Sequence, residues 1–467
     1  LLLDVFNTLG LPTSTTVSVI FSLLGASVAL AVYKVYVSGD SFSTLGNYIN
    51  TEKASEIVYS ILLSVALSFA LGSLVQYVSR LIFTFHIEKR YKYVAALFGG
   101  VAMTAITFFI LVKGLKSITF VPSEVKDFIK ESPLTIIAYS LILWTIVCQL
   151  LISVFKYSVF KFIIIVGTFG LALAFAGNDL VNFIGVPIAA YQAFEIWAAP
   201  GQTVGATEFM MSGLEKENLP APFIFLALAG LVMVYTLWTS KKAKSVIETE
   251  QNLSRQGEGN EKYNANTLSR NLVRAMMYLG NIISFILPKS LQRKLDAQFV
   301  QPEYTGKRDE QPMFDMVRAS VNLIVASILI SVGTSMKLPL STTYVTFMVA
   351  MGSSFADRAW DRESAVYRVA GVFNVIGGWF VTALAAFLSS AIIAYTLFIG
   401  EVFAFFAFMI VVAIFFYRSN QLHKKKVKEQ EEIKSLRKED IITIKEMITE
   451  SSSQISKVLY KKSNLYT

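Results

Sequence analysis

The chain has 467 residues, of which 54% are apolar and only 16% are charged, with a mean hydropathy of +0.55. This composition excludes an ordinary water-soluble globular protein. Many apolar runs are longer than about 18 residues, the length that indicates a bilayer-spanning helix. The formal charge of +9 does not imply a nucleic-acid partner, since Lys and Arg gather in a few loops and the tail, and the single cysteine, Cys148, excludes a disulfide framework.

Apolar segments follow one another along the chain, at residues 15–37, 55–79, 93–112, 133–155, 160–199, 221–239, 313–356, 365–396 and 399–417. Two of them, 160–199 and 313–356, are too long for one membrane helix. The first contains AGNDLVNFIGVP and the second GTSMKLPLSTT, so we expect helices that are broken at membrane depth. The opening residues LLLDVFNTLG resemble the middle of a membrane domain, and we expect at least one segment to precede them.

The distribution of basic residues predicts the orientation. The loop around Arg80, the stretch 240–311 and the tail sequence HKKKVK are basic, so we place them in the cytoplasm, with residues 38–54 and 200–220 outside. The last two apolar segments then form a hairpin. We therefore expect a multi-pass protein of the cell (inner or plasma) membrane with a cytoplasmic C-terminal tail.

One short motif occurs twice, as LPTSTT at residues 11–16 and as LPLSTT at residues 338–343. Aligning residues 11–27 with 338–354 gives seven identities in seventeen positions, including Gly25 with Gly352. The predicted orientation makes the two following helices run in opposite directions, which is typical of an inverted repeat. The alternative is that the motif merely caps a helix start twice, which the matching downstream spacing makes less favourable.

The chemistry of this motif favours an anion. Proline presets the first turn of a helix, while Ser and Thr hydroxyls join the free backbone N–H groups at its positive end. Such a helix start binds anions. Two of them meeting at the midplane would hold a tetrahedral oxyanion through many neutral donors.

The segment AGNDLVNFIGVP adds an acidic residue inside an apolar run. Asn178 and Asn182 are four residues apart and share a helix face, and Asp179 lies beside them. An ionisable group at membrane depth indicates a functional site. The amide and carboxylate oxygens of these three residues would suit a hard cation such as sodium. Alternatively, Asp179 alone could carry a proton. The alternative is a turn between two interfacial helices.

Together, GNDLVNFIGVP, LGLPTSTTVS and GTSMKLPLSTTYVTFMVAMGSSFADRAW resemble the signature segments of the inorganic phosphate transporter (PiT) family. The resemblance implies an all-α polytopic membrane protein in which two inverted-topology repeats bring broken helices or re-entrant hairpins together at the bilayer midplane. It implies symport of inorganic phosphate with sodium or protons by alternating access, commonly in a homodimer. By position, the phosphate-binding residues would be Ser14, Thr15, Thr16, Asn178, Asp179, Ser341, Thr342 and Thr343, and the sodium-binding residues Asn178, Asp179 and Asn182.

The sequence departs from the family pattern in two places. The family's first Gly-Asn-Asp motif, expected upstream of residue 11, is absent, and Val17 and Tyr344 stand where many members have histidine. Two alternatives stay open: a carrier of sulfate or another oxyanion with the same fold, and a membrane phosphate sensor that signals through its tail. An enzyme is not expected, since the chain has no nucleophile–base pair and no nucleotide-binding loop.

We divide the chain into five parts: 1–112, the remainder of the first transport repeat; 113–239, helices with the second-repeat Gly-Asn-Asp hairpin; 240–311, a cytoplasmic linker; 312–417, the end of the second repeat; and 418–467, a helical tail that starts a soluble domain. In the linker, Leu268, Leu272, Met276, Leu279 and Ile283 predict an amphipathic helix on the lipid surface. In the tail, Ile441, Ile444 and Ile448 predict a second amphipathic helix. Asp315 and Arg318 are three residues apart, which predicts an ion pair within one helix.

Overall fold

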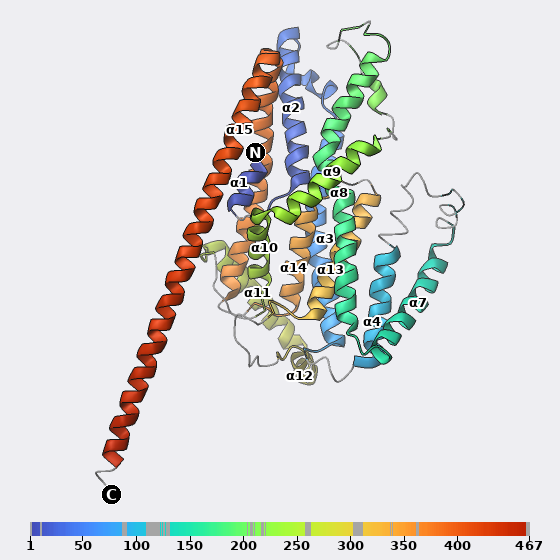
Figure 1. Cartoon of the computed structure of the whole chain (residues 1–467). Coiled ribbons are helices and arrows are strands. Elements are labelled where there is room, and N and C mark those ends of the chain that lie inside the picture. The colour runs from blue at the N-terminus through green and yellow to red at the C-terminus, as the bar shows by residue number, and fades with distance from the viewer. Residues whose placement is uncertain are drawn as a thin grey trace.

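The structure is a computed structural model that describes residues 2–9, 12–85, 91–108, 122, 124, 127, 131–202, 204–205, 209, 211–215, 219, 221–256, 263–301, 312–336, 338, 340–360 and 364–463. Every regular element in this part of the chain is a helix, and six helices are long and apolar enough to cross a membrane. The prediction of an all-α polytopic membrane protein is therefore confirmed. The long last helix extends beyond one end of the bundle, which is called the tail side from here on (Figure 1).

The helices in chain order are α1 (Leu2–Leu9), α2 (Thr15–Ser38), η1 (Phe42–Asn47), α3 (Thr51–Ile82), α4 (Tyr91–Ile106), α7 (Pro133–Ser153), α8 (Val159–Ala198), η4 (Ser212–Glu215), α9 (Phe223–Thr239), α10 (Lys241–Ser254), α11 (Thr267–Ile286), α12 (Lys289–Gln298), α13 (Met316–Ser335), α14 (Thr342–Ala356) and α15 (Ser364–Ser463).

Helices α2 and α14, which follow the two copies of the motif, run in opposite directions, as predicted (Figure 1). Helix α3 returns antiparallel to α2 after the short turn at η1. Helix α14 runs parallel to α3, because Gly72 lies against Val349 and Arg80 binds Asp357 further along both helices. The assignment of two complete inverted repeats stays a prediction.

The helices that follow the two motif copies each make an equivalent packing contact with a different neighbouring helix. The backbone of α15 at Phe387 touches Gly25 of α2, and the backbone of α3 at Phe69 touches Gly352 of α14 so closely that neither glycine has room for a Cβ atom. Gly25 and Gly352 are the pair that the motif alignment places at the same position. Close backbone approach at small residues is how helices associate in lipid. The α2–α15 and α14–α3 pairs are therefore built in the same way.

The apolar run 313–356 is interrupted, as predicted. Helix α13 ends at Ser335 and α14 begins at Thr342, so the LPLSTT motif forms the connection of a helical hairpin. Both ends of this hairpin lie on the tail side, where Arg80 of α3 binds Asp315 before α13 and Asp357 after α14.

The predicted break in 160–199 is wrong. Helix α8 is continuous over 40 residues and passes through Gly177, Asp179 and Pro187. A proline inside a helix removes one backbone hydrogen bond and usually only kinks it, whereas a full break in an apolar environment would leave several polar backbone groups without partners. The Gly-Asn-Asp segment is thus a face of one helix and forms no hairpin by itself.

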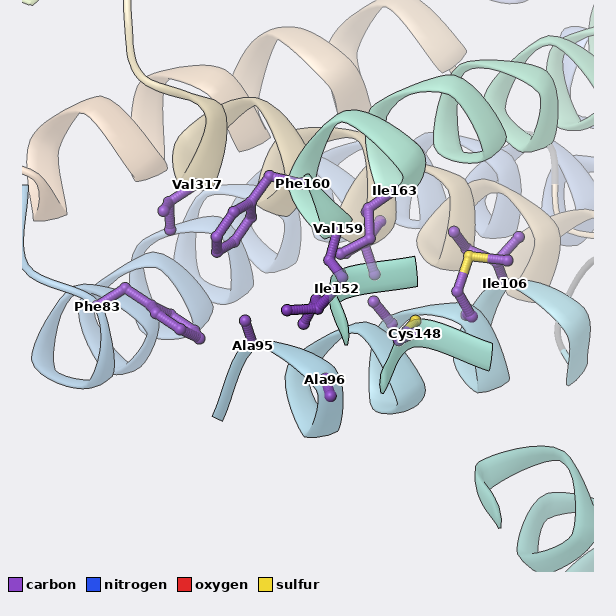
Figure 2. Close-up of a cluster of buried hydrophobic side chains, with 13 residues drawn as sticks. Phe83, Ala95, Ala96, Ile106, Cys148, Ile152, Val159, Phe160, Ile163 and Val317 are labelled. Carbon is purple, nitrogen blue, oxygen red and sulfur yellow. The ribbon is translucent and has the colours of Figure 1, made fainter. Parts of the chain in front are cut away.

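A cluster of buried side chains joins α4, α7 and α8 beside the hairpin (Figure 2). Cys148 of α7 has no exposed surface and belongs to this cluster together with Val159 and Ile163 of α8. Cys148 is therefore a packing residue of this apolar core. Val317 of α13 joins the same cluster, so this core attaches the hairpin to the peripheral helices.

Helix α15 contains two helical parts that meet at Glu401, where the backbone leaves the helical region. The two parts form a hairpin near the end of α2, and the second part returns to the tail side (Figure 1). This agrees with the hairpin predicted for the last two apolar segments. The side chains of Ile441, Ile444 and Ile448 lie outside the described residues, as do those of Leu279 and Ile283 in α11.

A buried ion cluster closes the tail side of the hairpin. Arg80, with no exposed surface, donates to Asp357 Oδ2 at 2.7 Å, to Asp315 Oδ2 at 2.8 Å and to Asp315 Oδ1 at 3.0 Å. Asp315 also caps α13 by accepting from the backbone N–H of Arg318 at 3.1 Å. The ion pair predicted between Asp315 and Arg318 is therefore replaced by a different one, because the Asp315 carboxylate pairs with Arg80 of α3.

Replacing Arg80 by Gln removes the guanidinium that binds the buried carboxylate of Asp357 and the partly exposed carboxylate of Asp315. Breaking a buried ion pair by removing one partner costs about 3–5 kcal/mol, so we expect a loss of this size in the free energy of unfolding. Asp296→Asn is the matched control, because its pair with Arg358 is more than half exposed and contributes about 0–1 kcal/mol. Thermal unfolding in detergent measures both. Equal melting temperatures for the two variants would contradict the assigned role of Arg80.

Adding one methyl group at either shared glycine should push two helices apart. We expect Gly25→Ala and Gly352→Ala each to lower stability by about 1–3 kcal/mol through overpacking. Gly230→Ala in α9 is the control, because a Cβ atom there meets nothing within 4 Å. If Gly25→Ala melts together with the Gly230 variant, the close contact between α2 and α15 is not present in the protein.

Candidate functional site

The two motif copies form two helix starts of the same design. Ser14 caps α2 by accepting from the backbone N–H of Val17 at 3.1 Å, and Ser341 caps α14 by accepting from that of Tyr344 at 3.1 Å. Both serines are almost completely buried. The capping role that the sequence left open as an alternative is thus present, and it orients both positive helix ends.

Asp179 of α8 lies at the start of α14. The hydroxyl of Thr342 donates to both of its carboxylate oxygens, at 3.1 and 3.0 Å, and Asn178 Nδ2 donates to Oδ1 at 3.1 Å. The side chains of Thr15 and Asn182 also lie near this carboxyl group. A negative charge at the positive end of a helix is favourable, which explains how the carboxylate is held there.

The start of α2 joins the same group of residues. Thr16 Oγ1 accepts from Asn182 Nδ2 at 2.8 Å and from Asn178 Nδ2 at 3.5 Å. Asn178 Nδ2 also lies 3.3 Å from the carbonyl oxygen of Leu340, the residue just before the second cap. Asn178 therefore connects the two helix starts, although Thr16 and Leu340 are far apart in the sequence.

Helix α15 braces the same region from the opposite side. Trp379 donates from Nε1 to the carbonyl oxygen of Pro12 at 3.1 Å and stacks on Tyr344 with ring centroids 3.7 Å apart. Thr382, one turn further on, forms a hydrogen bond of 3.2 Å with Thr13. One rigid helix thus contacts the residues that enter α2 and the first turn of α14.

Most of the predicted site residues come together here. Asn178, Asp179, Asn182, Thr15, Thr16 and Thr342 form the polar network, and Ser14 and Ser341 cap its two helix starts. Thr343 lies in the first turn of α14, where its carbonyl oxygen accepts from Thr346. The sequence did not reveal Leu340, which acts through its backbone, or Trp379, which no motif marks.

This arrangement offers both kinds of ion a partner. The hydroxyls and helix N-termini are donors that suit an oxyanion, whereas the Asp179 carboxylate and the Leu340 carbonyl oxygen are the hard oxygen ligands that suit a small cation. The described residues contain no cluster of three or more His, Cys, Asp and Glu side chains that would hold a resident metal.

The bundle of membrane-spanning helices defines a polytopic membrane protein, and Asp179 lies in it between two helix starts. Residues 1–249, more than half of the chain, match the family model described as the phosphate transporter family, and the chain belongs to that family. The protein is therefore a membrane phosphate transporter and not an enzyme.

A search of curated proteins gave no match. A solved structure described as "The sodium-dependent phosphate transporter" is similar to this chain, with 16% identity over 85% of this chain and 88% of its own, and a TM-score of 0.44. A likeness at this level carries no argument about the site or the mechanism.

Thr342→Val removes the hydroxyl that holds both oxygens of Asp179 while keeping the size of the side chain. Losing a hydrogen bond to a charged group costs about 1.5–3 kcal/mol, so we expect phosphate affinity to fall about tenfold or more. Thr346→Val is the control, because its hydroxyl bonds only to the backbone of its own helix. Equilibrium binding of labelled phosphate to purified protein is the measurement, and equal affinities in the two variants would remove Thr342 from the site.

Proposed function

We propose that the protein is a secondary active transporter that carries inorganic phosphate together with sodium through the site around Asp179. The observation that supports this most directly is the single, partly buried network that links one carboxylate to two helix starts. The carboxylate supplies the negative charge that a cation needs, and the helix starts supply donors for the anion. Each ion then reduces the electrostatic cost of binding the other.

The geometry also suits alternating access. Helices α2 and α14 approach the site from opposite ends of the bundle, each parallel to a long partner helix. A motion of the α14–α3 pair against the α2–α15 pair would open the site to one side and then to the other, as in transporters built from inverted repeats. Phosphate would bind in the proposed contacts with Ser14, Thr15, Thr16, Asn178, Ser341, Thr342 and Thr343.

Several further expectations go with this proposal. The basic loops and the C-terminal tail would face the cytoplasm, and the exposed apolar residues of α11, among them Leu268 and Phe285, would contact the lipid surface. A homodimer is expected from the family resemblance. Cross-linking in native membranes, and labelling from each side of the membrane of a cysteine introduced into the tail, would test these points.

The deciding experiment is uptake of labelled phosphate by the full-length protein in proteoliposomes. We expect an inward sodium gradient to drive uptake, sulfate to compete poorly, and Asp179→Asn to reduce uptake at least tenfold without changing the amount of folded protein. Uptake that follows a proton gradient would assign protons as the coupling ion. Phosphate binding without uptake under any gradient would overturn the transporter proposal and favour a sensor.

A further inference from the structure

The ion cluster on the tail side contains a second arginine, Arg318, which forms no hydrogen bond to either carboxylate. Arg80 takes up the oxygens of both acidic residues, with Nε and Nη2 on Asp357 and with Nη1 and Nη2 on Asp315. Arg318 of α13 lies in the same cluster, and its Nε is 3.9 Å from Asp357 Oδ2, beyond hydrogen-bonding distance. Both arginines are buried beside the carboxylates of Asp315 and Asp357, but only Arg80 forms hydrogen bonds with these carboxylates.

Arg318 has no exposed surface, yet part of its guanidinium is unused. Nη1 donates to Ser354 Oγ at 3.3 Å, and the group lies over the ring of Phe314. Its Nε and Nη2 atoms are buried without a hydrogen-bond partner. This Nε–Nη2 edge is the one that Arg80 uses to bind Asp357 with two parallel hydrogen bonds, the geometry that suits carboxylate and phosphate.

Two amide side chains at neighbouring levels are also incompletely bonded. Asn322 lies one turn from Arg318 on the same face of α13, and its Oδ1 atom has no partner, while Gln76 of α3 lacks partners at both Nε2 and Oε1. Gln76 lies one turn before Arg80, at the level where α3 passes the end of α14. A buried polar group without a hydrogen-bond partner lowers the stability of the fold by about 1–3 kcal/mol. Three such side chains, those of Arg318, Asn322 and Gln76, therefore indicate a bound ligand or waters.

We propose that Arg318, Asn322 and Gln76 form a second oxyanion-binding site between Asp179 and the tail side, which phosphate occupies on its way through the bundle. This inference rests on the proposed function for the direction of transport, but the site itself is defined by its own residues. Ser354, which binds Arg318, lies about 18 Å along α14 from Thr342, because each helical residue rises about 1.5 Å. The second site is therefore separate from the first.

Thiol labelling of the full-length protein tests the site without relying on transport. In a Cys148→Ala background, which removes the only cysteine in the sequence, Asn322→Cys introduces one thiol beside Arg318. We expect a negatively charged thiosulfonate reagent to label it, and phosphate to slow the labelling at least tenfold. Val321→Cys, buried in the neighbouring apolar core, is the control and should stay unlabelled.

The role of Arg318 is tested by adding Arg318→Gln to the Asn322→Cys protein. Labelling by the anionic reagent should slow at least tenfold and lose its sensitivity to phosphate, whereas Arg318→Lys should retain part of both. A positively charged reagent should not label Asn322→Cys faster when Arg318 is present than when it is replaced by Gln. Labelling of Asn322→Cys that is as slow as that of Val321→Cys, or that ignores phosphate or Arg318, would overturn the proposal.

The outcome is independent of the proposed function. If wild-type protein fails to accumulate phosphate but phosphate still protects Asn322→Cys, the transporter proposal fails and the second site stands. If uptake is normal and labelling is insensitive to phosphate, the second site fails and the transporter proposal stands.

Discussion

The arrangement of the bundle depends on the hydrogen bonds that hold the carboxylate of Asp179. A charged group inside an apolar helix is expensive unless it is held by polar partners, and here those partners come from Thr342 of α14 and from the neighbouring Asn178. Asn178 and Asn182 extend the contact to Thr16 of α2. Giving this partly buried charge its polar partners therefore requires both motif copies to lie against the same face of α8.

The rest of the fold holds these three helices in register. Gly25 and Gly352 bring α15 and α3 close to the two motif helices, and Trp379 attaches the entry to α2 to the first turn of α14. On the tail side, Arg80 fixes both ends of the α13–α14 hairpin to α3. These contacts hold the donors in place in this conformation, and donors that are already in position bind a ligand at a lower cost in entropy.

Much of this was predictable from the sequence, for physical reasons. Apolar runs identify membrane helices, and a motif repeated with the same downstream glycine identifies equivalent helix starts. The continuity of α8 was not predictable, because Gly177 and Pro187 also occur within membrane helices that only bend. The pairs of Arg80 with Asp315 and Asp357 were missed because the partners lie 235 and 277 residues away in the sequence. The pair that was predicted for Asp315, with Arg318, spans only one helical turn. Trp379 acts through a backbone contact that leaves no pattern in the sequence.

Coupled binding of the two ions at Asp179 is the central claim, and equilibrium binding tests it most directly. Labelled phosphate is titrated into purified full-length protein in sodium and in choline, and labelled sodium with and without phosphate. The account predicts that each ion raises the affinity of the other by the same factor, since coupling between sites is reciprocal, and that Asp179→Asn abolishes both effects. Phosphate affinity that is the same in sodium and in choline would contradict the claim.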